Sequence, residues 1–353
     1  GCRSPLRRPH SDKISHKLEL AAHEKPFLDM LWQWQTYRRE IYNMVKIFRT
    51  IDNNVHQINE AQEGSWIALI DPTATEIVEI AEKYDIDVDH LRAPLDEEER
   101  SRIEVEDHYT LILVDIPMIE ERNDKEWYGT IPMGIVVTDD KIFTVCLEDT
   151  PVLSSFMDGR VRNFFTYKRT RFILQILYRN ASLYLHYLRI IDKKSDEVEQ
   201  KLHKSQRNQE LIELLELQKS LVYFTTSLRS NEVVLEKLLK VENIKQYPED
   251  TELLEDVIIE NKQAIEMTNI YSGILSGTTE AFASIISNNL NIVMKFLATV
   301  TIVMSIPTMI ASFWGMNVPV PLAHSAHGFL ILVIVSLILT IFGGYILGKK
   351  NMF

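Results

Sequence analysis

Two long apolar stretches near the C-terminal end constrain this chain more than any other feature. The first, residues 292–314, can cross a bilayer as a helix, because about 20 apolar residues at roughly 1.5 Å rise per residue span about 30 Å of hydrocarbon. The second, residues 328–347, contains no charged residue and is followed by Lys349 and Lys350. A chain with these segments is expected to cross a membrane twice, with the long preceding part outside the hydrocarbon.

The first stretch keeps one polar face. Four hydroxyl residues recur at helical spacing and therefore lie on one side of a helix. They are Thr301, Ser305, Thr308 and Ser312, and the same face runs back through Ala298, Met294 and Asn291 and forward to Gly315. Such a face packs against a neighbouring membrane helix or lines a water-filled path. The amides of Asn291 and Asn317 favour the path, since they stand at the two ends of the span, where wet surroundings satisfy them more easily.

The positions of the lysines indicate the orientation of both spans. Lys295 lies near the beginning of the first span, and Lys349 and Lys350 follow the second. These are the two ends that share one side of the membrane, so the positive-inside rule places both chain termini in the cytoplasm. The loop of residues 318–327 then lies outside, and Asn317 faces the external mouth.

The C-terminal region resembles a known family. Gly315-Met316-Asn317 at the outer end of the first span, a short outer loop, a second span and a basic tail are similar to the CorA family of magnesium channels. The tripeptide alone is a weak signal, but its combination with this topology and a long preceding helix is specific. The resemblance covers the chain from about Met44 to Phe353. It implies an α+β cytosolic domain, a long helical stalk and two C-terminal transmembrane helices, assembled as a homopentameric funnel in the plasma membrane.

The resemblance also implies which residues meet the ion. The first span of each subunit lines the pore, and the Asn317 side chains form a ring at the outer entrance that recognises Mg²⁺ with its water shell. The expected selectivity filter is Gly315, Met316 and Asn317. The expected pore-lining residues are Asn291, Met294, Leu297, Ala298, Thr301, Ser305, Thr308 and Ser312. Met294 and Leu297 stand where apolar side chains can constrict and dewet the path.

Relatives in this family sense cytosolic Mg²⁺ through carboxylates between neighbouring subunits, and the resemblance implies a similar regulatory site. Asp256, counted back along the uninterrupted helix from the tripeptide, matches the acid on the stalk. Asp96 and Glu97, in an acidic run of residues 96–99, are the candidates for its partner. The alternative is that this run is a solvated acidic loop. Mg²⁺ is thus the expected transported and regulatory ion, and no organic cofactor is expected.

The pattern of the whole chain predicts its division into segments. Residues 1–43 are basic at first and lack a sustained apolar core, and they are expected to be a leader or an appended extension. The other expected segments are a cytosolic α/β domain (44–163), an antiparallel helical hairpin (164–241), a stalk helix (251–290), a pore helix (291–314), an external loop with the tripeptide (315–327), a second span (328–347) and a basic tail (348–353).

Local patterns predict individual elements. The predicted strands are residues 45–51, 66–70 and 110–116, with a hairpin over 131–147 that turns at Asp139 and Asp140. Two helices are predicted in the α/β domain. The first starts at residues 71–73 and runs through Lys83, and a second, short helix begins near Val88. No proline follows Thr251 until Pro307, so the helix that enters the membrane is expected to exceed 60 residues.

Composition limits the function classes. A net charge of −12 argues against a nucleic-acid partner, which would need a basic face, and suits a protein that handles cations. Cys2 and Cys146 are too few and too distant to predict a disulfide framework or a zinc site. No nucleotide-binding or common hydrolase motif is present, so an enzyme is not expected. The expected partners are further copies of the chain, membrane lipid and divalent cations.

Two alternative functions remain open from the sequence. The first is a cobalt, nickel or zinc transporter of the same architecture, although the Met316 of the tripeptide favours magnesium. The second is a membrane-anchored cation sensor without ion flux, in which the two spans serve only as a tether.

Overall fold

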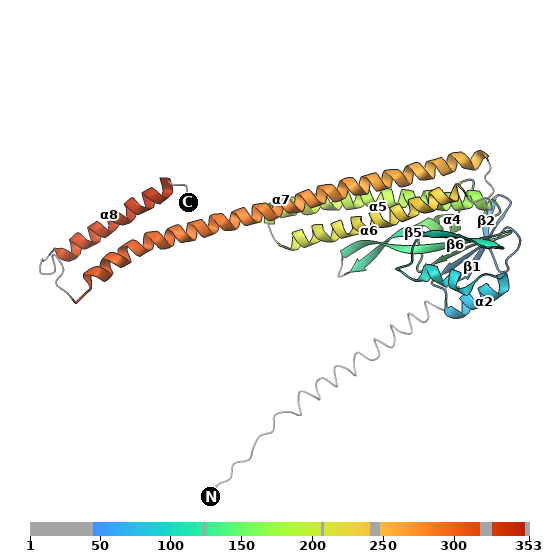
Figure 1. Ribbon diagram of the computed structural model, residues 1–353, viewed down its shortest axis with the longest axis horizontal. Coiled ribbons are helices and arrows are strands. Elements are labelled where there is room, and N and C mark those ends of the chain that lie inside the picture. Colours follow the sequence, from blue (N-terminus) through green and yellow to red (C-terminus); the bar gives the residue numbers. More distant parts are fainter. Residues whose placement is uncertain (1–44, 123–124, 206–207, 241–247, 318–326, 350–353) are drawn as a thin grey trace, which may run out of the picture. The chain divides into compact units, whose positions relative to one another are not determined.

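The structure is a computed structural model that describes residues 45–122, 125–205, 208–240, 248–317 and 327–349 (Figure 1). The expected leader at residues 1–43 lies outside the described residues, as do most of the outer loop and the end of the basic tail. The chain divides into two compact units. Gly1–Ile191 and Lys219–Asn269 make up the first, and Asp192–Gln218 and Ile270–Phe353 make up the second.

The first unit contains one seven-stranded sheet with the order β2-β1-β3-β7-β6-β5-β4. The strands are β1 (Val45–Ile51), β2 (Asn54–Ile58), β3 (Trp66–Ile70), β4 (Arg102–Val105), β5 (Tyr109–Arg122), β6 (Lys125–Thr138) and β7 (Ile142–Cys146). All neighbouring pairs are antiparallel except β3 and β7, which are parallel. The structure confirms the strands predicted at residues 45–51 and 66–70 and the hairpin turn between β6 and β7.

Helices follow the capping signals of the sequence. They are α2 (Ala74–Tyr84), α3 (Val88–Arg92), the 3₁₀ helix η1 (Ala93–Leu95), α4 (Pro151–Met157), α5 (Arg169–Ser205), α6 (Asn208–Leu238), α7 (Pro248–Trp314) and α8 (Gly328–Lys349). The start of α2 is a capping box, because Thr73 accepts the Glu76 N–H while the Glu76 carboxylate accepts the Thr73 N–H. The helix that was expected to exceed 60 residues is α7, which has 67.

The two faces of the sheet pack against different helices, as the alternation of side chains along a strand requires (Figure 1). Trp66 and Ala68 of β3 face a core shared with α4, α5, α6 and the first turns of α7. Ile67 and Leu69 of the same strand face a second core shared with α2 and α3. The sheet is therefore buried on both faces, which explains why its central strands are almost entirely apolar.

Side chains of α5 and α6 form hydrogen bonds with the backbone of Asp115 in β5 and so hold both helices against the sheet. Strand β4 pairs with β5 only as far as Leu113, and the residue opposite Asp115 on β6 is Pro132, which has no N–H. The Asp115 carbonyl oxygen instead accepts hydrogen bonds from Asn180 (2.8 Å), Tyr184 (3.2 Å) and Asn231 (2.8 Å). Its N–H donates to the Asn231 side-chain oxygen at 2.9 Å.

The Asp115 contacts also fix the direction of the two helices. Asn180 of α5 and Asn231 of α6 meet at the same backbone group, and Tyr184 packs against Phe224 with ring centroids 5.0 Å apart. Along α5 the residue number rises from Asn180 to Tyr184, while along α6 it falls from the partner position Asn231 to Phe224. The two helices are therefore antiparallel. Most of the buried polar atoms at this site are paired, which limits the cost of burying them, whereas the side-chain oxygen of Asn180 is buried without a hydrogen-bond partner.

Candidate ion-conduction site

The hydroxyl face of α7 lies in the second unit, and its side chains are solvent-accessible in the isolated chain. Asn291, Met294, Leu297, Ala298, Thr301, Thr308 and Ser312 are exposed, and Ser305 is half-buried. Met294 and Leu297 are each 58% exposed, as are other apolar side chains around this part of α7, such as Val293 at 58%. In a membrane this face must border lipid, water or a second protein surface.

Three of the four hydroxyls on this face form hydrogen bonds with their own helix. Thr301 donates to the Leu297 carbonyl oxygen at 2.8 Å, Ser305 to that of Ile302 at 2.7 Å, and Thr308 to that of Met304 at 3.1 Å. The protons of these three hydroxyls are thereby used within the helix, and the lone pairs of their oxygens remain available.

This arrangement suits a hydrated cation. The water molecules around a cation point their oxygens inward and their O–H groups outward, so the shell presents only donors. A row of hydroxyl oxygens whose protons are already committed presents acceptors. The face can therefore contact an ion that keeps its water.

Helix α8 packs against a different side of α7. A side chain at Gly343 of α8 would meet Ile306 of α7 at 2.8 Å, so the two helices approach closely there. Thr299 is buried, and Val303, Ile306 and Ile310 are half-buried. These positions lie two residues, or about 200° around the helix, from Thr301, Ser305, Thr308 and Ser312. Helix α8 thus leaves the hydroxyl face of its own chain uncovered.

The tripeptide follows directly where α7 ends. Gly315 still donates its N–H to the Ala311 carbonyl oxygen at 2.9 Å, and a Cβ at Gly315 would lie only 3.3 Å from that oxygen. Met316 and Asn317 come after the last helical turn and are exposed. The C-terminal end of a helix carries partial negative charge, which favours a cation beside it.

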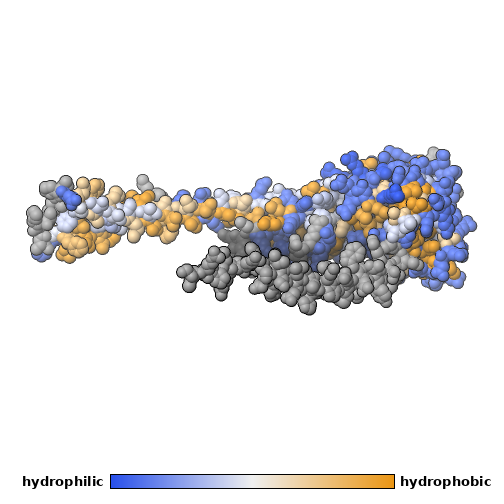
Figure 2. Space-filling model, turned by 90° about the horizontal axis from the view of Figure 1, so that it is seen from below, coloured by the Kyte–Doolittle hydropathy of each residue, from blue (hydrophilic) through white to orange (hydrophobic). Residues whose placement is uncertain are grey.

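Both C-terminal helices are long and apolar enough to cross a membrane. Only 6% of the most apolar window of α7 and none of that of α8 is buried within the chain, so neither segment is the core of a soluble domain. Figure 2 shows apolar side chains over much of the surface of α8 and of the C-terminal part of α7. Such a surface requires lipid or further protein around it.

The acids of the expected regulatory site lie in the first unit. Asp256 is an exposed residue of α7, and Asp96 and Glu97 are exposed in the turn after η1. The Asp96 side chain accepts the Glu98 N–H at 3.1 Å, which orders this turn. Among the described residues, no hydrogen bond or ion pair joins Asp256 to Asp96 or Glu97 within one chain.

The structure adds neighbours of Glu97 that the sequence analysis missed. Burial raises the pKa of the Glu148 carboxyl, and the nearby carboxylates of Glu120, Glu97 and Asp149 raise it further. These acids come from β5, from the turn after η1 and from the segment after β7, so no local pattern in the sequence groups them. Repulsion among them would be relieved by a bound cation.

The fold and the exposed C-terminal helices together define an integral membrane protein with a large domain outside the membrane. The family model described as CorA-like Mg2+ transporter protein matches residues 61–349. The chain therefore belongs to the CorA-like Mg²⁺ transporter family, as the tripeptide and the topology predicted.

One curated relative agrees with this assignment, and two solved structures share the fold. The cobalt/magnesium transport protein CorA of Methanocaldococcus jannaschii is 28% identical over 288 residues, which cover 78% of this chain and 88% of that protein. The complete structure of the CorA magnesium transporter from the same organism has a TM-score of 0.77 at 24% identity, and covers 88% of this chain and 99% of that one. The structure of the full-length CmaX protein has a TM-score of 0.64 at 12% identity, and the match covers 87% of this chain and 96% of that one. The two structural likenesses show the fold.

Proposed function

We propose that this protein is a homopentameric channel that conducts Mg²⁺ through a pore lined by α7. The observation that carries the proposal is the uncovered hydroxyl face, which runs from Asn291 to Ser312 and ends at the tripeptide. The name of the M. jannaschii relative supports transport of magnesium or cobalt, and family membership supports the same class here.

Assembly from several copies follows from the size of the membrane part. Two helices cannot enclose a water-filled path, and non-helical backbone is not tolerated against lipid, so a pore requires several copies around an axis. Residues 251–290 of each copy form the stalk in this proposal, and residues 291–314 form the wall of the pore. The hydroxyl faces then meet at the axis, and α8 lies outside them.

Selectivity is assigned to Gly315, Met316 and Asn317. Mg²⁺ demands an octahedral oxygen shell and gives up its water reluctantly. A ring of neutral Asn317 amides can accept hydrogen bonds from that shell without holding the ion too tightly to release it. Gly315 keeps the backbone close to the helix end, because a side chain there would crowd the Ala311 carbonyl oxygen.

The proposed location is the plasma membrane, with both termini in the cytoplasm. Lys295 and Lys349 lie at the ends of the two spans that share one side, which supports this orientation through the positive-inside rule. The α/β domain then samples cytosolic Mg²⁺.

Regulation is assigned to carboxylates between subunits. Asp256 of one subunit and Asp96 and Glu97 of its neighbour would bind Mg²⁺ and hold the channel closed, and the acids around Glu148 would add to the negative potential. Loss of the ion would let these carboxylates repel one another and loosen the ring.

The variant Asp256→Ala tests this regulation. It is expected to raise the internal Mg²⁺ concentration that halves the flux by at least about fivefold, which is a common size of allosteric coupling. The measurement is Mg²⁺ flux into proteoliposomes preloaded with graded Mg²⁺. Glu255→Ala removes the neighbouring exposed carboxylate of α7 and should leave the inhibition unchanged. Equal inhibition in Asp256→Ala and the unaltered protein would rule out this assignment.

Uptake into vesicles tests the function itself. Purified protein in liposomes is expected to take up Mg²⁺ at a rate that rises with an inside-negative potential, as an ion-sensitive dye inside the vesicles would report. Parallel assays with Co²⁺, Ni²⁺ and Zn²⁺ separate magnesium from the alternative of a cobalt, nickel or zinc transporter. Vesicles that take up none of these ions would instead support a membrane-anchored sensor without flux.

A further inference from the structure

A second group of possible metal ligands lies at the β4 edge of the sheet, in the first unit. His90 belongs to α3, Glu104 to β4, and Glu106 to the turn between β4 and β5. One ligand atom of each, an imidazole nitrogen or a carboxylate oxygen, lies within 4.8 Å of the others. None of these residues belongs to the hydroxyl face, the tripeptide or the proposed regulatory acids.

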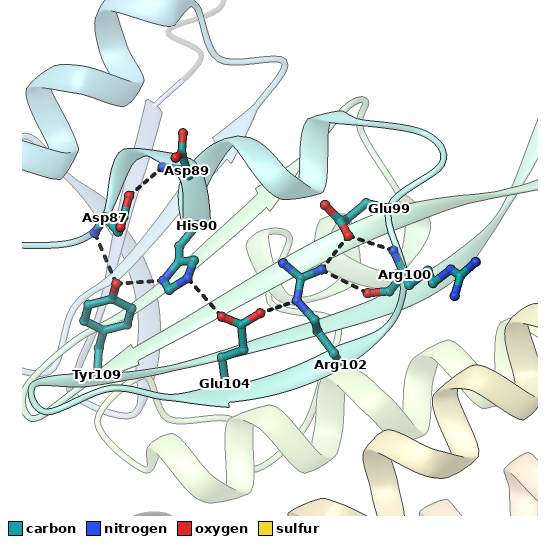
Figure 3. Close-up of polar contacts among 8 residues, drawn as sticks. All are labelled: Asp87, Asp89, His90, Glu99, Arg100, Arg102, Glu104 and Tyr109. Carbon is teal, nitrogen blue, oxygen red and sulfur yellow. Dashed lines mark hydrogen bonds and ion pairs between the residues drawn. The ribbon is translucent and has the colours of Figure 1, made fainter.

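The imidazole ring of His90 is held from both sides (Figure 3). Its Nδ1 lies 2.7 Å from the Tyr109 hydroxyl oxygen, which also accepts the Asp87 N–H at 3.2 Å. Its Nε2 lies 3.0 Å from Oε2 of Glu104. In metal-binding histidines the nitrogen that does not bind the metal is usually held in this way by a second group, which orients the ring.

Glu104 is also oriented in advance. Its Oε1 accepts a hydrogen bond from Nε of Arg102, which leaves Oε2 directed at His90 (Figure 3). Arg102 is in turn held by Glu99 and by the Arg100 carbonyl oxygen. One oxygen of Glu104 can therefore bind a metal while the other keeps its contact with Arg102.

The distance between the two ligand atoms matches a shared metal. With metal–ligand bonds of about 2.1 Å, adjacent ligands lie about 3.0 Å apart in an octahedral site and about 3.4 Å apart in a tetrahedral one. The observed separation of His90 Nε2 and Glu104 Oε2 is 3.0 Å. A metal ion can therefore replace the contact between them without a change in the separation of the two ligand atoms, once both side chains turn toward it. The exposed side chain of Glu106 supplies a third ligand by rotation.

The ligand types determine which metal fits. Mg²⁺ is a hard cation that takes oxygen ligands, and an imidazole nitrogen in the site disfavours it. Co²⁺, Ni²⁺ and Zn²⁺ bind imidazole and carboxylate together readily. We propose that His90, Glu104 and Glu106 form a binding site for a divalent transition metal, of a different chemistry from the magnesium path along α7.

The test measures Co²⁺ binding to the purified full-length protein in detergent, with excess Mg²⁺ present to occupy the oxygen sites. Equilibrium dialysis gives the number of Co²⁺ ions per chain, and visible absorption reports the coordination of Co²⁺. His90→Gln is expected to lower the bound Co²⁺ by one ion per chain. His108→Gln changes an exposed histidine in the same turn region and should keep the full number.

A second variant protects the test against loss of folding. Glu106 is exposed, so Glu106→Gln should not disturb the fold, yet it should weaken Co²⁺ binding at this site by at least about tenfold. The readout is binding and does not depend on ion flux, so it is independent of the channel proposal. Unchanged Co²⁺ number and affinity in both His90→Gln and Glu106→Gln would overturn the site, and so would a loss in His108→Gln equal to that in His90→Gln.

Discussion

Replacing Asn317 by alanine is expected to reduce Mg²⁺ uptake by proteoliposomes to the rate of protein-free vesicles. The amide oxygen is the group that accepts hydrogen bonds from the water shell of the ion, and alanine offers nothing in its place. A dehydrated Mg²⁺ cannot pass instead, because the ion gives up its water too reluctantly. The measurement is the initial rate of dye-detected uptake at a fixed inside-negative potential.

Ser336→Ala is the matched control for Asn317→Ala. Ser336 is a half-buried polar residue of α8, which is the helix that lies away from the hydroxyl face, and its loss should leave uptake near the unaltered rate. Reconstitution efficiency and oligomer size are compared for both variants. Full uptake by Asn317→Ala would remove Asn317 from the filter, whereas no uptake even by the unaltered protein would favour the sensor without flux.

The elements that the sequence predicted are those with strong local patterns. Strands β1 and β3 are rich in β-branched and aromatic residues and match the prediction residue for residue. Strands β2 and β4 were missed, since both are short edge strands with mixed polar composition. The strand predicted at residues 110–116 extends over Tyr109–Arg122, because its polar end pairs with β6.

The side-chain groupings depend on tertiary structure and escaped the sequence analysis. Glu97 and Glu148 are brought together only when the turn after η1 packs beside the end of β7. His90 meets Glu104 because α3 lies against the β4 edge. The hydroxyl face is the exception, because a single helix positions all of its members and helical spacing alone reveals it.

Trp66→Ala is expected to destabilise the first unit more than any other single change discussed here. Trp66 is completely buried, stacks on Phe48 at 5.0 Å between ring centroids, and meets Phe172 edge-on at the same distance. Its indole N–H donates to the Thr144 hydroxyl at 2.9 Å. Removing a buried tryptophan costs about 3–5 kcal/mol in unfolding free energy. Thermal unfolding of the purified protein, followed by circular dichroism, should shift downward by on the order of 10 °C.

Trp127→Ala is the control for Trp66→Ala, because it removes a tryptophan that is less deeply buried. Trp127 is half-buried near the start of β6, and its ring centroid lies 5.5 Å from that of Tyr223. Its removal therefore leaves a smaller cavity and should lower the transition temperature much less. Equal shifts in the two variants would contradict the assignment of Trp66 as the centre of the core between the sheet and the long helices. Because that core holds the start of α7, its loss should also loosen the helix that leads to the proposed pore.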